Sequence, residues 1–336
     1  MNDVTAIKKL SGYDLSGFSL VGSDLAGANL AQAKLRGANL AGADLSGADL
    51  TQADLSGADL SGAHLYQAKL AGARMVGTNL SHSDCTSANF LDARLSGTRF
   101  YSARLAGANL QNAQLNAADF TECDLSSADL SGAKLSGAVF TKANLNRANL
   151  SDSKLFGASM HKVNLRNSNL RGADIGAAKL RGSDLREADM VNVNLFNADL
   201  SNANVQGTNL EGATMRATTL SGAMLRNVVF DGANLAHSRL SRADFSEASF
   251  EESNLWASRT SGSVFTKVNF KAANLMATGL NKKFTLSEFP DVKHSKRTTW
   301  DDAHFKRVAV SSSAHRQSIE TEAAKRSFFS RIFGKR

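Results

Sequence analysis

One residue in five carries a large apolar side chain, without a break in register from Leu10 to Leu280. Every fifth position in this range is Leu, Phe, Met, Ile, Val or Cys, and Thr260 is the one polar exception. The residue two places earlier is small throughout, from Ser23 to Thr278, and the residue just before the apolar one is rich in Asp and Asn. A repeat of this length in a single register dictates the fold of the whole segment.

A spacing of five residues fits neither regular secondary structure. An α-helix advances about 100° per residue, so successive apolar side chains would lie about 140° apart around the helix. A straight strand alternates its faces, and an odd spacing would send them to opposite sides. All of them face one axis if the chain turns by about a quarter circle after each unit, so that four units close a square coil of about 20 residues. The second track must then be small, because a bulky residue beside each Leu would overpack the narrow interior at about 1–3 kcal/mol per site.

The repeat unit resembles that of the pentapeptide-repeat family, whose consensus is Ala-(Asp/Asn)-Leu-X-X. Residues 38–40 (Ala-Asn-Leu) and 128–130 (Ala-Asp-Leu) are two of many matches, and the resemblance covers residues 23–278. It implies an all-β fold, a right-handed quadrilateral β-helix. Because some members of the family mimic duplex DNA and protect DNA gyrase from its poisons, the resemblance also implies gyrase or topoisomerase modulation as an alternative function. Those rods are acidic, however, whereas residues 1–280 carry 26 Lys/Arg and 25 Asp/Glu.

Changes in the repeat pattern predict four segments. Near the start, Tyr13 and Phe18 replace the small side chains, which indicates a cap or a frayed first coil. After Leu280 the pattern stops, and Phe284 and Leu286 are expected to fold over the last coil. The predicted boundaries are 1–22 for an N-terminal cap, 23–280 for the β-helix, 281–317 for a C-terminal cap and linker, and 318–336 for a short helix.

The C-terminal segment, residues 318–336, is predicted to form a basic amphipathic helix. Residues 281–336 hold 13 Lys/Arg and 6 Asp/Glu, so they carry seven of the eight net positive charges of the chain. On a helical wheel four large apolar side chains share one arc, and cations flank them. The apolar residues are Phe328, Phe329, Ile332 and Phe333, and the cations are Lys325, Arg326, Arg331, Lys335 and Arg336.

Basic amphipathic helices bind at the membrane interface with their cations toward anionic lipid. The segment also resembles the C-terminal membrane-targeting helices of some bacterial division-site proteins. Docking to a membrane or to a partner is therefore predicted. The alternative is that the Phe side chains pack against the rod itself or in a homodimer contact.

The sequence contains no arrangement of residues typical of catalysis or of cofactor binding. Its seven His are scattered, without zinc-site spacing, and no glycine run matches a phosphate-binding or dinucleotide-binding motif. Asp shares one repeat position with Asn, which favours hydrogen bonding to the backbone or surface ladders over calcium binding. We therefore expect no enzymatic activity, cofactor or metal. Cys85 and Cys123 fall on inward-facing tracks, so buried, reduced thiols are predicted, as in a cytoplasmic protein.

Residues 20 apart should stack on one face of a square coil, which aligns charged side chains along the rod. One such ladder carries the cations Lys34, Arg74, Arg94, Lys134 and Lys154, interrupted by Asp54, Gln114 and Asp174. The opposite ladder carries Asp24, Asp44, Asp84, Asp124, Asp184 and Asp244, and a further basic group comprises Lys162, Arg166, Arg171, Lys179, Arg181 and Arg186. Like charges stacked about 4.8 Å apart repel, so an oppositely charged partner would stabilise such a ladder. The alternative is that the charges only keep a long rod soluble.

Together these features predict a non-enzymatic scaffold for protein–protein interaction, tethered to a membrane or a complex by its C-terminal helix. The expected partner is another protein, together with an anionic membrane surface if the tail binds lipid. Direct binding of nucleic acid is not expected, and a homodimer is left open. The expected location is the cytoplasm, at the inner face of the membrane if the tail is a lipid anchor.

Overall fold

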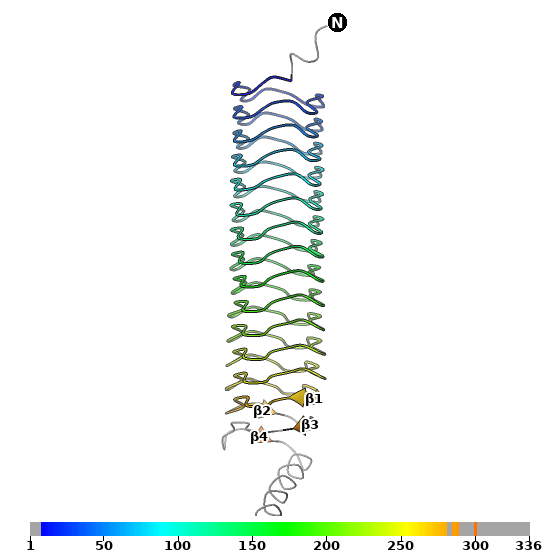
Figure 1. Cartoon of the computed structure of the whole chain (residues 1–336), viewed down its shortest axis with the longest axis vertical. Helices are drawn as coiled ribbons and strands as arrows, with labels where there is room; N and C mark the ends of the chain where they lie inside the picture. The colour runs from blue at the N-terminus through cyan, green and yellow to red at the C-terminus, as the bar shows by residue number, and fades with distance from the viewer. Residues whose placement is uncertain (1–7, 281–283, 289–298, 301–336) are drawn as a thin grey trace, which may run out of the picture.

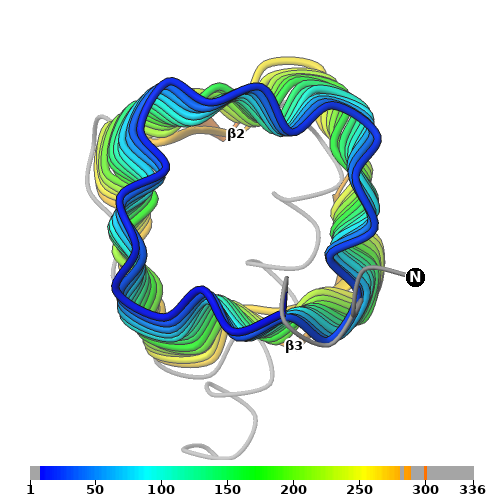
Figure 2. The same ribbon diagram turned by 90° about the horizontal axis from the view of Figure 1, so that it is seen from above.

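The computed structural model describes residues 8–280, 284–288 and 299–300, and these form a rod of stacked coils (Figure 1). Parallel bridges link residues 20 apart, from Lys9 and Asn29 to Asn254 and Asn274, without a shift in register. Along its axis the rod has a square outline in which successive coils nearly superimpose, each rotated slightly from the last (Figure 2). The predicted quarter turn per five residues is therefore confirmed.

The unit around Leu130 shows how five residues make one side of the square. The amide of Ala133 donates to the carbonyl of Leu130 at 3.1 Å and closes a β-turn. The amide of Leu130 donates to the carbonyl of Asn149 in the next coil at 2.7 Å. The amide of Lys134 donates to the carbonyl of Ala113 in the preceding coil at 2.9 Å. Turns and neighbouring coils together satisfy the backbone, which fixes the flat faces of the rod.

Each corner of the coil is a tight turn whose third residue has a positive φ. This holds for all 54 such positions from Gly12 to Ala277, of which 23 are Gly. The other 31 are L-residues with φ between 53° and 63°. Type II turns require a positive φ at this position. Since steric strain in this region is worst for branched side chains, it is consistent that none of the 31 is Val, Ile, Thr, Phe, Tyr or Trp.

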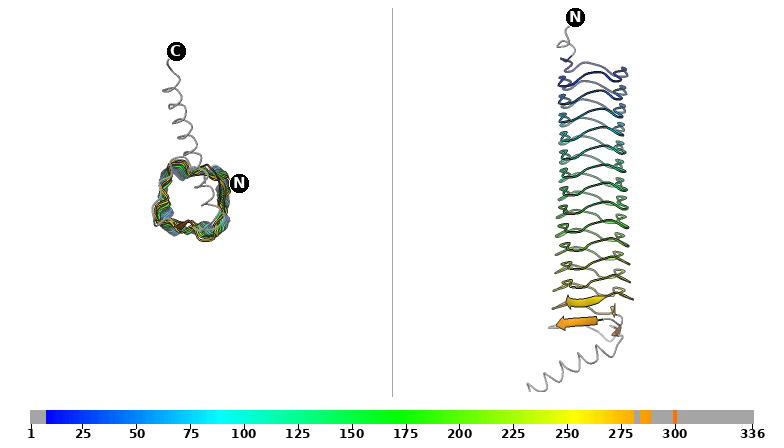
Figure 3. Two further views of the ribbon diagram at one scale, coloured as in Figure 1. Left: turned by 90° about the horizontal axis from the view of Figure 1, so that it is seen from below. Right: turned by 90° about the vertical axis from the view of Figure 1, so that its right-hand side faces the viewer.

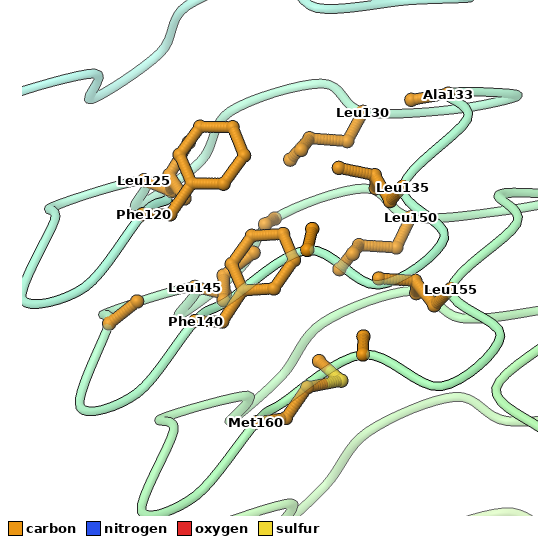
Figure 4. Close-up of a cluster of buried hydrophobic side chains, with 14 of the residues drawn as sticks. Phe120, Leu125, Leu130, Ala133, Leu135, Phe140, Leu145, Leu150, Leu155 and Met160 are labelled. Carbon is orange, nitrogen blue, oxygen red and sulfur yellow. The ribbon is translucent and has the colours of Figure 1, made fainter. Parts of the chain in front are cut away.

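The apolar track fills the axis of the rod. From Leu25 to Leu275 every residue on it is buried, and none is more than 2% exposed. Figure 4 shows one stretch of this core, in which Phe120 lies above Phe140 and the Leu side chains of adjacent coils stack in the same way. The Phe120 and Phe140 rings are nearly parallel, with centroids 4.9 Å apart. Each such side chain contributes about 1.5–3 kcal/mol by its burial, so the core ladder is the main source of stability.

Polar residues on the small track bond to the backbone of the core. The hydroxyl of Thr78 donates to the carbonyl of Leu55 in the preceding coil at 2.8 Å, and that of Ser83 donates to the carbonyl of Leu80 at 2.7 Å. Cys85 and Cys123 are free and buried, as predicted. Burial raises the pKa of Cys85 to about 12 and also raises the pKa of Cys123, so both thiols stay protonated.

Short strands continue the stack at its C-terminal end, where Figure 3 shows two of them as arrows. Strand β1 (Phe265–Asn269) pairs in parallel with β3 (Phe284–Glu288), and β2 (Gly279–Leu280) pairs with β4 (Thr299–Trp300). Gly279 lies opposite Thr299, so the 20-residue register reaches beyond residue 280 on this side. The β1–β3 register is irregular.

At the opposite end the stack starts within the segment that the sequence assigns to a cap. Lys9 is already bridged to Asn29, 20 residues later. Tyr13 and Phe18 stand on the small track of this first coil and are 60% and 56% exposed. Their bulk is tolerated there because small-track side chains, such as Thr78, point toward the preceding coil, and this coil is the first that the structure describes.

Candidate interaction surface

The five cations of the predicted basic ladder lie on one flat face of the rod. Parallel bridges join consecutive ladder positions, and all five cations are exposed while the interrupting residues are half-buried. The bridged positions run in the order Lys34, Asp54, Arg74, Arg94, Gln114, Lys134, Lys154 and Asp174. The alignment inferred from the 20-residue coil is thus present in the structure.

The N-terminal part of the ladder is partly neutralised. Lys34 Nζ lies 3.8 Å from Asp14 Oδ2, and Arg74 Nε donates to Ser56 Oγ at 3.3 Å. Burial would raise the pKa of Asp54, but hydrogen bonds from the Ser56 hydroxyl and amide, helped by the charges of Arg36 and Arg74, lower it overall. Asp54 therefore stays ionised and screens the cations on either side.

The central part of the ladder carries uncompensated charge. Arg74 is bridged directly to Arg94, and Lys134 directly to Lys154. Within residues 8–280 no ion pair forms at Arg94, Lys134 or Lys154. Two unit charges about 5 Å apart repel by about 1 kcal/mol in water, and an anionic ligand would relieve this repulsion. These three cations are the strongest candidate binding residues of the predicted ladder.

The opposite face is less acidic than the sequence pattern indicates. His64 and Arg104 lie between the aligned Asp residues. Arg104 pairs with Asp84 at 3.4 Å, and Arg226 with Asp244 at 2.7 Å. This face is therefore largely charge-compensated, because cations from its own ladder and from the adjoining corner reach the carboxylates.

The further basic group does not form one patch. Arg171 pairs with Asp189 at 3.0 Å, and Arg186 donates to both carboxylate oxygens of Asp184. The six residues occupy three corners and one face of the square coil, since they fall at different places in the 20-residue register. Their proximity in sequence therefore has no counterpart in a shared surface.

The Asp and Asn residues that precede the core residues bond to the turns. The side-chain oxygen of Asp44 accepts the amide of Ser46 at 2.9 Å, and Asn29 accepts the amide of Ala31 in the same way. Asn side chains also link adjacent coils, as where Asn149 Nδ2 donates to Asp129 Oδ1 at 3.1 Å. In the described part of the chain, His, Cys, Asp and Glu form no group of three or more suited to a metal ion. The backbone role expected for these residues is confirmed.

Sequence analysis missed one surface feature, an exposed apolar edge. The side chains of Phe156, Phe196, Trp256 and Met276 are 54%, 47%, 43% and 40% exposed. All four sit at the same place in the 20-residue register, so they share one corner of the rod. This spacing was visible in the sequence, but exposed positions were compared there only for charge.

The tail residues proposed for docking, Lys325, Arg326, Phe328, Phe329, Arg331, Ile332, Phe333, Lys335 and Arg336, lie outside the described residues. Among the residues that are described, no helix has the length and apolar character needed to cross a bilayer.

The family of the chain follows from its repeats. The model described as "Pentapeptide repeats" matches overlapping segments that together span most of the chain. The matched residues are 9–42, 23–62, 63–100, 98–137, 133–172, 173–212, 194–232, 229–259 and 243–278. The chain therefore belongs to the pentapeptide-repeat family, whose members fold as right-handed β-helices, as the resemblance implied.

Several solved structures are similar to the chain. HetL, a pentapeptide-repeat protein involved in heterocyst differentiation regulation in the cyanobacterium Nostoc, is 26% identical and aligns over 80% of this chain and 92% of its own, with a TM-score of 0.33. QnrB1, a plasmid-mediated fluoroquinolone resistance protein, is 22% identical over 62% of this chain and 87% of its own, with a TM-score of 0.37. A pentapeptide-repeat protein of the Arabidopsis thaliana thylakoid lumen is 31% identical over 34% and 76%, with a TM-score of 0.24. No curated protein sequence matches the chain.

Proposed function

We propose that the chain is a non-enzymatic scaffold that binds an acidic surface of another protein, and that it does so in the cytoplasm. The observation that carries this proposal is the row formed by Arg94, Lys134 and Lys154, three exposed cations on one flat face with no ion pair among the described residues. Family members are generally structural or interaction proteins, which supports a role without catalysis.

The geometry of the face favours a rigid, extended partner. Arg94 and Lys134 are two coils apart, or about 10 Å, and Lys154 follows after about 5 Å more. Backbone bonds between coils fix these intervals, so little conformational entropy is lost when a partner with matching carboxylates binds. The near balance of charge over residues 1–280 supports a protein partner rather than direct binding of nucleic acid.

A charge-reversal experiment tests this role. The full chain is compared with the variant Arg94→Glu, Lys134→Glu, Lys154→Glu in quantitative affinity capture from the native cell extract, followed by binding measurements on the captured protein. A matched control, Lys69→Glu, Arg99→Glu, Arg166→Glu, changes the net charge equally but on other sides of the rod. We expect the ladder variant to lose the partner and the control to keep it. Equal binding by all three proteins would show that the ladder is not the binding site.

We further propose that residues 318–336 tether the scaffold to an anionic membrane or to a larger complex. The support is the sequence pattern alone, four apolar residues on one helical arc with five cations around them. Cell fractionation of the full chain against a chain ending at residue 317 tests the tether. If both distribute alike between soluble and membrane fractions, the tail is not a membrane anchor. Size-exclusion chromatography of the same pair tests whether the tail makes a homodimer contact.

Modulation of DNA gyrase is the alternative function implied by the family. A DNA mimic needs a strongly acidic surface, whereas this rod is nearly neutral and its central ladder is basic. The similarity to QnrB1, a fluoroquinolone resistance protein, is a similarity of fold. A supercoiling assay distinguishes the two functions, since a scaffold of the proposed kind leaves gyrase activity unchanged at micromolar concentration.

A further inference from the structure

One corner of the rod forms an apolar ridge in its C-terminal half. We name it the aromatic corner, and it comprises Phe156, Phe196, Trp256 and Met276. These residues are separated by multiples of 20, and Figure 2 shows that equivalent points of successive coils lie nearly over one another at each corner. Backbone bonds link the coils there, as where the amide of His237 donates to the carbonyl of Trp256 at 2.8 Å. The four side chains therefore follow one line along the rod.

Small residues in adjacent coils hold the aromatic rings against this corner. A Cβ placed on Gly176 would lie 3.1 Å from Phe156 Cδ2, so the Phe156 ring covers the backbone of Gly176. Ala236, on the same line, is only 3% exposed, and the Trp256 ring makes an edge contact with His237 at a centroid distance of 4.5 Å. One side of each ring thus packs on the rod while about half of the residue faces solvent. The ridge is built into the fold rather than formed by loose side chains.

Unpaired cations border the aromatic corner on both adjoining faces. Between residues 154 and 279 the corner and these two faces carry five Lys/Arg but two Asp. The cations are Lys154, Lys179, Arg216, Arg239 and Arg259, and none has an ion pair within the described ranges. Asp174 accepts a hydrogen bond from Asn194, and Asp199 accepts one from Ser201. The border is therefore basic, with an excess of three positive charges.

We propose that the aromatic corner is the edge along which the rod lies on an anionic lipid surface. Half-exposed aromatic and Met side chains suit the interfacial region of a bilayer, and the bordering cations suit anionic headgroups. The corner is convex, so it fits a soft flat surface better than it could enclose a partner helix. A second copy of the chain would bring the same cations together and be repelled. The proposal goes beyond the tail tether, because it uses different residues at a different place on the rod.

A fluorescence experiment on the full chain tests the proposal directly. Trp256 and Trp300 are the two Trp residues, so the variant Trp300→Phe leaves Trp256 as the sole indole reporter. The probes are vesicles of phosphatidylglycerol and phosphatidylcholine at 3:7, with and without bromine on the acyl chains. We expect the Trp256 emission to shift to the blue and to be quenched by the brominated lipid. If the protein binds the vesicles but Trp256 is not quenched, the tail holds the protein and the corner proposal is wrong.

Vesicle sedimentation provides the second measurement. The variant Phe156→Ser, Phe196→Ser, Trp256→Ser is compared with the matched control Tyr66→Ser, Tyr101→Ser, Met224→Ser, whose side chains are equally exposed on other parts of the rod. We expect the corner variant to lower the partition coefficient by about tenfold or more and the control to leave it nearly unchanged. Phosphatidylcholine vesicles alone should bind weakly. Equal binding by variant and control, or no binding by the unaltered chain, would overturn the proposal, and the second result would favour an acidic protein as the occupant of this ridge.

Discussion

The turn geometry makes an unusual prediction, that replacing certain alanines by glycine stabilises this protein. Ala117, Ala217 and Ala257 occupy the third position of their turns, with φ of 56°, 59° and 55°. Ala117 is exposed and the other two are half-buried, so deletion of their methyl groups removes little packing. In most folds the same change destabilises, because glycine loses more conformational freedom on folding.

The expected gain follows from two opposing terms. An L-residue in the left-handed region is strained by about 1–2 kcal/mol, which glycine relieves. The entropic penalty of glycine is about 0.5–1 kcal/mol. The net stabilisation is therefore about 0.5–1 kcal/mol per site, and about 1.5–3 kcal/mol for the three sites, since they lie far enough apart for their effects to add.

The matched control uses alanines one position earlier in equivalent turns. Ala41, Ala71 and Ala106 are half-buried and their φ angles are not positive. Substituting these three by glycine should destabilise by about 0.5–1 kcal/mol per site. Urea unfolding followed by circular dichroism should give a higher midpoint for the first set and a lower one for the control, at similar m-values. If both sets lower the midpoint alike, the left-handed turn does not strain these alanines and the reasoning is refuted.

Three further predictions concern the core, the carboxylates and the thiols. Phe120 stacks between Phe100 and Phe140 at 4.8 and 4.9 Å, so Phe120→Ala should destabilise by about 3–5 kcal/mol in urea unfolding, and Phe120→Leu should destabilise far less because Leu is the usual residue of this track. Hydrogen bonds from Ser46 and Thr51 lower the pKa of Asp44 and Asp49 below the unfolded value, so their contribution to stability is present above about pH 4 and is lost as the pH falls through the folded pKa. Unfolding midpoints measured from pH 6 to pH 2 should show this loss, and Asp44→Asn with Asp49→Asn, which keeps the acceptor oxygen, should reduce it. Burial and a raised pKa make Cys85 and Cys123 inert, so Ellman's reagent should titrate both thiols only after unfolding, and fast labelling of the native chain would contradict their burial.

Much of the fold could be predicted because one requirement recurs in every unit. Leu130 and its equivalents must all face inward, and only a quarter turn every five residues achieves this. The square coil, the buried thiols and the alignment of Lys134 with Lys154 all follow from that requirement. The left-handed residue of each turn was harder to see. Gly marks it at fewer than half of the positions, and only the absence of branched residues marks it at the others.

The state of the surface depends on side-chain geometry, which a repeat pattern does not encode. Arg226 reaches Asp244, 18 residues away, and Arg104 reaches Asp84, 20 residues away, so the aligned carboxylates are compensated. Whether a given cation finds such a partner depends on which neighbouring coil it leans toward. The aromatic corner could have been found from the spacing of Phe156 and Phe196. Its exposure and its support by Gly176 required the structure.

Pulsed electron spin resonance distances along one face test the stacked coil most directly. Spin labels are placed at Gln114 and Asn194, and in a second protein at Gln114 and Asn274, which lie four and eight coils apart on the same ladder. Stacked coils predict separations of about 19 and 38 Å, a doubling with narrow distributions. A helical body would place the first pair about 120 Å apart, and a separation that did not double for the second pair would contradict the square coil.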